Sequence, residues 1–218
     1  MLERILCLII GYVFGLFQTS YIYGKLKGID IRAHGSGNAG ATNALRTLGA
    51  KAGVISFFGD ALKCVFAMTA VRLIFAGSHG DILPVLAMYA GTGVILGHNF
   101  PFYLNFRGGK GIAATGGLMF ATNLVLTLIC AVLFATVFLT THYVSLGSLL
   151  VYLALVIQLV YFGQTGFFEG MAQPALTEMY IVAFCLMAMA YWRHRSNIKK
   201  LLTGTERKTY ISKKNKVD

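Results

Sequence analysis

The segment Gly35-Ser-Gly-Asn-Ala-Gly-Ala-Thr-Asn-Ala-Leu-Arg46 separates two long apolar runs of the chain. It combines three glycines with small polar side chains and a guanidinium. Glycine allows a positive φ and a close approach of the backbone to a ligand, and successive N–H groups in such a loop can surround an anion. A guanidinium binds phosphate through two hydrogen bonds. The segment therefore predicts a site for a phosphate-bearing ligand, although a flexible polar loop has a similar composition.

The spacing of Gly35, Gly37 and Gly40 also spells G-x-G-x-x-G, the dinucleotide-binding fingerprint. That fingerprint requires a buried strand before it and a βαβ unit around it. The preceding residues, 27–34, are too few and too charged to form such a strand. A dinucleotide-binding domain is therefore not expected.

The composition is that of an integral membrane protein. Of the 218 residues, 56% are hydrophobic and only 12% are charged, and the mean hydropathy is +0.68. Globular domains carry about 25% charged residues. The formal net charge of +11 would suggest nucleic acid for a soluble protein. Here the basic residues flank apolar runs, so orientation in the membrane and contact with anionic lipid explain them, and no nucleic acid partner is expected.

Cysteine and histidine patterns give no sign of a metal or cofactor. Cys7, Cys64, Cys130 and Cys185 lie far apart in apolar runs, so we expect small buried side chains rather than disulfides. The five histidines and eight acids form no H-E-x-x-H or carboxylate cluster. We therefore expect neither a metal nor a cofactor.

Charge in the connecting segments predicts the topology. Segments 25–51 and 101–111 and the chain from Arg193 onward are basic, whereas 77–82 and 163–175 contain no Lys or Arg. The positive-inside rule places the basic segments in the cytoplasm and the other two outside. The apolar runs themselves lie at 5–24, 52–76, 83–100, 112–140, 143–162 and 176–192.

Six crossings would leave the basic C-terminal region on the wrong side of the membrane. We therefore expect run 112–140 to be two helices, a short one at 112–121 and a longer one at 124–141, with one long tilted helix as the alternative. At about 1.5 Å per residue the short helix cannot span a core of about 30 Å, so it would be a half-membrane helix shielded by its neighbours. The prediction is an all-α integral membrane protein with seven transmembrane helices, some short or half-membrane, with the N-terminus outside and the C-terminus cytoplasmic.

In this topology four polar clusters share the cytoplasmic face. They are 35–46, 97–111, 144–148 and 193–197. Within the second, Gly108-Gly-Lys-Gly111 lacks the first glycine and the Ser or Thr of a P-loop. It still predicts a helix start that binds phosphate through free N–H groups and the Lys110 charge.

Three further polar side chains stand out in or beside apolar runs. Asp60 and Lys63 share one helix face inside the second run, so Asp60 is expected to pair with Lys63 or to support Arg46, in a structural and orienting role. His98 ends the third run and is either a structural group or part of the site. His194 lies between two arginines, which favour its neutral form.

These motifs resemble, in order, those of the PlsY family, the bacterial membrane glycerol-3-phosphate acyltransferases that use acyl phosphate. The resemblance spans residues 8–208 and includes the C-terminal Leu202-Thr203-Gly204, although Arg107 stands where many relatives carry Lys. The His-x₄-Asp motif of the widespread glycerolipid acyltransferases is absent. The resemblance implies one membrane domain at 1–208, a basic cytoplasmic tail at 209–218, and an active site on the cytoplasmic face of the bacterial plasma membrane.

The resemblance also implies a reaction. The 1-hydroxyl of glycerol 3-phosphate attacks acyl phosphate, giving lysophosphatidate and inorganic phosphate in the first step of phospholipid synthesis. The implied partners are these two substrates, membrane lipid and, through functional coupling, the soluble enzyme that makes acyl phosphate. The acyl chain is expected to enter sideways from the membrane.

Two substrate phosphates require two anion sites. One would use the loop 36–42 with Gly109 and Lys110, and the other would use Arg46, Ser145, His194 and Asn197. The hydroxyl proton would pass to His98 or to a substrate phosphate. The expected catalytic residues are His98, Ser36 and Lys110, and the expected binding residues are Gly37, Asn38, Gly40, Thr42, Asn43, Arg46, Gly108, Gly109, Ser145, His194 and Asn197.

Two other classes of protein share some of these features. A transporter of organic phosphate would also use glycine loops and broken helices, but near the midplane of two related halves. No internal repeat is evident in this sequence. A lipid-binding or scaffold protein would not need so dense a set of Gly, Asn and His.

Overall fold

The computed structural model describes residues 1–168 and 170–210, so part of the predicted tail, from 211 on, lies outside the described residues. Within those two ranges the regular structure is helical throughout, without β-strands. Three short 3₁₀ turns link some of the helices. The helices are α1 (Leu2–Gly15), α2 (Thr19–Leu26), α3 (Ala41–Leu48), α4 (Ala50–Phe75), α5 (Leu83–Asn99), α6 (Ile112–Thr122), α7 (Leu124–Thr141), α8 (Val144–Gln164), α9 (Gln173–Arg193) and α10 (Arg195–Leu202).

Six stretches of the described chain are long and apolar enough to cross a membrane. Many of their large apolar side chains face outward, for example Leu73 and Val132, which are 79% and 66% exposed. An apolar outer surface is what a lipid environment requires of a spanning helix. Helix α6 is apolar but shorter than these spans. The six stretches are Leu2–Leu26, Ala50–Phe75, Gly80–Leu104, Leu124–Thr141, Val144–Gln164 and Gln173–Arg193.

The predicted break in run 112–140 is confirmed, and the single long helix is excluded. Asn123 between α6 and α7 is extended, and its Oδ1 accepts from the amide of Val125 at 2.7 Å, the N-cap role that asparagine favours. At the other side of the break, Arg72 of α4 donates to the carbonyl of Ala121 at 2.6 Å. Each helix end is thereby supplied with a hydrogen-bond partner at the break.

The first apolar run, 5–24, forms two helices within one membrane span. It breaks between α1, which ends at Gly15, and α2, which begins at Thr19. The buried side-chain amide of Gln18 donates to the carbonyls of Gly15 at 3.2 Å and His98 at 3.0 Å. Lys63 donates to the carbonyl of Phe17 at 2.6 Å. The break is stabilised by residues distant in sequence, so local hydropathy could not reveal it.

Helices α1 and α5 pack through glycines spaced four residues apart. A Cβ added to Gly11 would lie 1.9 Å from the carbonyl oxygen of Ala90, and one added to Gly97 would lie 2.3 Å from that of Tyr12. Such small residues let two membrane helices approach closely. This close contact holds the C-terminal end of α5, with His98, against the break between α1 and α2.

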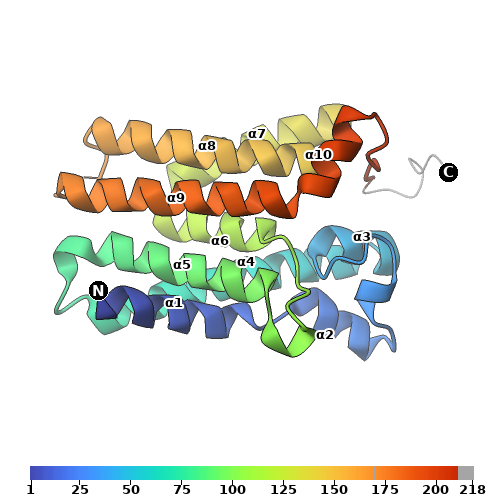
Figure 1. The fold of residues 1–218 in the computed structure, drawn as a ribbon, viewed down its shortest axis with the longest axis horizontal. Coiled ribbons are helices and arrows are strands. Elements are labelled where there is room, and N and C mark those ends of the chain that lie inside the picture. Colours follow the sequence, from blue (N-terminus) through green and yellow to red (C-terminus); the bar gives the residue numbers. More distant parts are fainter. Residues whose placement is uncertain (169, 211–218) are drawn as a thin grey trace.

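The elements that carry the four polar clusters meet at one end of the bundle. Figure 1 shows α3, the loop after α5, the α7–α8 junction and α10 at the same end. The amide of Thr209 donates to the carbonyl of His142 at 2.9 Å, which ties the segment after α10 to the α7–α8 junction. Three of the four cysteines are buried as expected, whereas Cys185 is exposed on α9.

Candidate active site

One cavity of about 360 Å³ collects side chains from all four clusters. Of the site residues expected from the sequence, Gly37, Gly108 and Gly109 do not line it. Those that do are Ser36, Asn38, Gly40, Thr42, Asn43, Arg46, His98, Lys110, Ser145, His194 and Asn197. Segments separated by more than a hundred residues in the sequence thus form a single site.

Asn43 holds the first cluster in shape. Its Oδ1 accepts from the amide of Ser36 at 2.8 Å, and its Nδ2 donates to the carbonyls of Ile31 and His34 at 3.0 Å each. Gly35 has a φ of +61°, and a Cβ there would lie 2.2 Å from Asn43 Oδ1. Asn43 is 1% exposed and uses both side-chain groups on the backbone. Its visible role is therefore to position the loop that carries Ser36 and Asn38.

The second half of the cluster is a helix rather than the loop expected from its composition. Helix α3 begins at Ala41, directly after Gly40, and no side chain caps its N-terminus. Gly40, Ala41 and Thr42 line the cavity. The free N–H groups and positive dipole end of such a terminus favour an anion.

Arg46, on α3, binds the segment after α10. We call residues 203–210 the C-terminal strap. One guanidinium nitrogen of Arg46 donates to the carbonyl of Arg207 at 3.2 Å and to the hydroxyl of Thr209. The Arg46 Nε is buried with no partner among the described residues. Burial lowers the pKa of Arg46. The free N–H leaves one donor of this guanidinium for a ligand.

The strap also contributes a carboxylate that the sequence analysis missed. Glu206 Oε1 accepts from Ser145 Oγ and from Asn197 Nδ2, both at 2.8 Å. Glu206 and Thr209 line the cavity. One sequence signal could have found Glu206, because it is the only acid between Arg193 and Tyr210.

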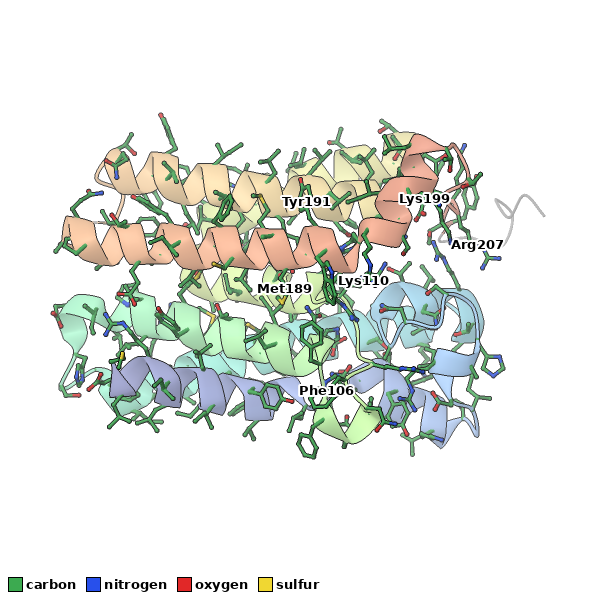
Figure 2. The ribbon with its side chains drawn as sticks, viewed as in Figure 1. Phe106, Lys110, Met189, Tyr191, Lys199 and Arg207 are labelled. Atoms are coloured by element: carbon green, nitrogen blue, oxygen red, sulfur yellow. The ribbon has the colours of Figure 1, made fainter. Side chains whose placement is uncertain are left out.

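Lys110 and His194 line the same cavity. Lys110 Nζ donates to Asn197 Oδ1. Burial is the main reason that the pKa of Lys110 is lowered to about 8. Burial, with Lys110 and Arg193 nearby, lowers the pKa of His194 to about 4. His194 is thus neutral, chiefly because it is buried rather than because it has basic neighbours. Figure 2 shows Lys110 at the end of the bundle that carries Lys199 of α10 and Arg207 of the strap.

Asp60, Lys63 and His98 form a buried cluster at the wall of the cavity, and Asp60 and His98 line it. Lys63 Nζ lies 2.8 Å from Asp60 Oδ1 and 2.9 Å from His98 Nδ1. Thr19 Oγ1 donates to the same carboxylate oxygen at 3.1 Å. The expected Asp60–Lys63 pair is confirmed. Among the described contacts Asp60 does not reach Arg46, so the alternative support for Arg46 is wrong.

The glycine loop before α6 packs against His98. The amide of Gly108 donates to the carbonyl of Asn99 at 3.2 Å, and that of Gly109 donates to the carbonyl of His98 at 3.0 Å. Arg193 donates to the Gly109 carbonyl at 2.6 Å. A Cβ on Gly109 would lie 1.9 Å from His98 Nε2. These two amides already have acceptors, so the contribution of Gly108 and Gly109 to a phosphate site stays a prediction.

The cavity has an apolar side that opens toward the outer surface. It is lined there by Val54, Phe57 and Phe58 of α4 and by Phe134 and Phe138 of α7. Phe57 and Phe58 are 44% and 57% exposed. The space therefore joins a cluster of hydrogen-bond donors to a face that lipid would cover. The sequence places these residues only within apolar runs. Their place in the cavity depends on how α4 and α7 pack, which hydropathy does not report.

Known proteins are similar to this chain in sequence and in fold. Residues 5–204 match the family model described as glycerol-3-phosphate acyltransferase. The chain is 45% identical over 206 residues to the glycerol-3-phosphate acyltransferase of Clostridioides difficile, covering 94% of each chain. It is 40% identical over 213 residues to that of Bacillus cytotoxicus, covering 97% of this chain and 98% of the relative.

Solved structures agree with the sequence comparison. The fold is similar to that of PlsY, an integral membrane glycerol 3-phosphate acyltransferase, in its glycerol 3-phosphate form, with a TM-score of 0.79 at 33% identity over 95% of this chain and 96% of that one. Its lysophosphatidic acid form gives a TM-score of 0.77 at 32% identity over the same shares. The chain belongs to the glycerol-3-phosphate acyltransferase family, which includes PlsY.

Proposed function

We propose that this family member transfers an acyl group from acyl phosphate to the sn-1 hydroxyl of glycerol 3-phosphate. The hydroxyl oxygen bonds to the acyl carbon, the bond from that carbon to the phosphate oxygen breaks, and its electron pair leaves with the phosphate. The products are lysophosphatidate, a phospholipid precursor, and inorganic phosphate. The observation that carries the proposal is a single cavity lined by two groups of side chains able to donate to phosphate and by an apolar side.

Two groups of donors match two substrate phosphates. The first combines Ser36, the N-terminus of α3 and Lys110, and the second combines Arg46, Ser145, His194 and Asn197. Lys110 and Asn197 are hydrogen-bonded to each other, so the two groups adjoin. Adjacent phosphates would hold the hydroxyl of one substrate near the acyl carbon of the other, which is how an enzyme lowers the entropic cost of reaction.

The apolar side of the cavity suits the acyl chain. Phe57 and Phe58 on α4 and Phe138 on α7 line it, and the first two are also exposed on the outer face. His98 lines the same cavity, so an apolar path reaches the polar cluster. A chain entering sideways from the bilayer would keep its methylene groups out of water, at about 0.8 kcal/mol for each.

The negative charge that develops on substrate oxygens during the reaction would be stabilised by groups already in the cavity. Phosphate is a good leaving group, so the site needs to stabilise anionic oxygens more than to donate a proton. Lys110 and the N-terminus of α3 can do so without reorganisation. The proton of the attacking hydroxyl goes to His98 or to a phosphate oxygen, the two acceptors left open by the sequence.

We also propose seven membrane passages, with the site on the cytoplasmic face of a bacterial plasma membrane. The basic segments 25–51, 101–111 and 193–208 support this orientation through the positive-inside rule. Helices α6 and α7 together return the chain to the end of the bundle where α6 begins (Figure 1), which supports counting α6 as a short passage. In this arrangement residues 1–208 form one domain, and acyl phosphate arrives from the soluble enzyme that makes it.

An acyl-transfer assay on purified, detergent-solubilised protein tests this function. Glycerol 3-phosphate is offered with palmitoyl phosphate or with palmitoyl-CoA, and lysophosphatidate is measured by mass spectrometry. The proposal predicts product from the acyl phosphate alone. Product from the thioester would assign a different donor. No product from either donor, in protein shown to be folded, would favour a transporter of organic phosphate.

A further inference from the structure

The contact between His98 and Lys63 determines which ring nitrogen of His98 carries a proton. Nδ1 of His98 lies 2.9 Å from Lys63 Nζ, and the two side chains are only 4% and 5% exposed. A lysine ammonium has three donors and no acceptor. At this distance the imidazole Nδ1 must therefore accept, and the proton of the neutral ring must lie on Nε2.

The surroundings of Lys63 supply several acceptors for its ammonium group. It donates to Asp60 Oδ1 at 2.8 Å and to the carbonyl of Phe17 at 2.6 Å, with the carbonyl of Gly15 at 3.3 Å. The two carbonyls are available because the helix breaks between α1 and α2. A buried ammonium with a carboxylate and several acceptors around it is compensated rather than isolated.

Asp60 is the competing partner for His98. Its Oδ1 lies 3.6 Å from His98 Nδ1, beyond hydrogen-bonding distance, and it already accepts from Lys63 and Thr19. If Lys63 lost its donor, a small shift would let this carboxylate accept an Nδ1 proton. Lys63 therefore determines whether Nε2 of His98 is a hydrogen-bond donor or an acceptor.

We propose that Lys63 is a positioning residue that keeps His98 as the Nε2–H tautomer, so that the ring presents a hydrogen-bond donor to the substrates. The role given to His98 rests on the proposed function. Nε2 is the ring atom next to Gly109, on the edge away from Lys63. In this tautomer His98 donates a hydrogen bond through Nε2 to an oxygen of acyl phosphate.

Nitrogen NMR on protein labelled with heavy nitrogen in histidine tests the tautomer directly. The His98 signals are identified by their loss in His98→Gln. We expect a pyrrole-type shift for Nε2 and a pyridine-type shift for Nδ1 in the unmodified protein. A protonated Nδ1 with a bare Nε2 in that protein would overturn the proposal, whether or not any variant folds.

Two substitutions at Lys63 separate positioning from packing. Lys63→Met removes the donor and should move the proton to Nδ1, whereas Lys63→Arg keeps only N–H donors and should retain the Nε2–H tautomer. An unchanged tautomer in folded Lys63→Met would overturn the proposal. Folding of each variant is verified by size-exclusion chromatography and thermal unfolding.

Kinetics supply the functional readout. In Lys63→Met we expect kcat to fall about 10²-fold with little change in KM, the loss typical of one hydrogen-bond donor to a developing negative charge. Lys63→Arg should recover most of that loss. Equal losses in both variants would overturn the role in catalysis. If the unmodified protein has the Nε2–H tautomer but transfers no acyl group from acyl phosphate, the tautomer assignment holds and the proposed function fails.

Discussion

At the scale of single residues, Gly109 lies so close to the His98 ring that no larger side chain fits between them. A Cβ at this position would overlap His98 Nε2, at 1.9 Å. We expect Gly109→Ala to displace the ring or the loop and to lower kcat by about 10²-fold, the loss typical of a 1 Å misplacement. Gly116→Ala on α6 is the matched control, because a Cβ there meets nothing within 4 Å. Steady-state kinetics of both variants measure the effect, and equal activity in the two would contradict the contact.

The lowered pKa of Lys110 predicts how activity depends on pH. The protonated lysine binds phosphate, and burial lowers its pKa to about 8. Above that pH the amine is neutral, so kcat/KM for glycerol 3-phosphate should fall by about tenfold per pH unit. The substrate phosphate does not contribute, because its second pKa is about 6. In Lys110→Arg the charge persists, so this decline should disappear while the absolute rate falls. A decline that persists in Lys110→Arg would assign it to another group.

The sequence predicted which residues line the cavity better than it predicted their contacts. Eleven of the fourteen expected residues line the cavity, because clustered glycines and short polar side chains are rare between apolar runs. The role of Asn43 in holding the loop and the contact of Lys63 with His98 depend on packing between distant segments. No local pattern reports such contacts. Glu206 was missed because it lies beyond the motif that marked α10.

At the scale of elements, α6 depends on a cation supplied by another helix. Arg72 of α4 donates to the Ala121 carbonyl near the C-terminal end of α6. Replacing Arg72 with Met leaves that carbonyl without its partner, at a cost of about 1–3 kcal/mol. We expect a lower thermal unfolding temperature in detergent. The control, Lys51→Met at the exposed start of the same helix, should leave it unchanged. Equal stability of the two variants would show that α6 does not need this contact.

The two helix breaks differ in how far the sequence could predict them. The basic segments can all lie on one side of the membrane only if run 112–140 crosses it twice, which required a break. Asn123 is a favourable N-cap at that position. The break at Leu16–Gln18 does not change the side of the membrane on which any charged segment lies, so the distribution of charge could not predict it. It exists because Gln18 and Lys63 satisfy backbone carbonyls from inside the bundle. A break of that kind is visible only once the helices are packed.

At the scale of the whole molecule, the count of membrane passages can be measured. In a background without the native cysteines, single cysteines replace the exposed residues Lys25, Ser78 and Thr203. A membrane-impermeant maleimide is applied to right-side-out vesicles. We expect labelling of Ser78→Cys alone, and labelling of the other two only after permeabilisation. Lys25→Cys and Thr203→Cys on opposite sides would show that α6 does not count as a passage.

The arrangement of the molecule gives one chemical claim, that a hydroxyl in the cavity attacks the acyl carbon of acyl phosphate. The most direct test offers purified protein palmitoyl phosphate and glycerol 3-phosphate with heavy oxygen in the 1-hydroxyl. Mass spectrometry then follows the label. The proposed function predicts labelled lysophosphatidate and unlabelled inorganic phosphate, because the carbon–oxygen bond of the acceptor stays intact. Heavy oxygen in the phosphate, or lysophosphatidate without label, would contradict it.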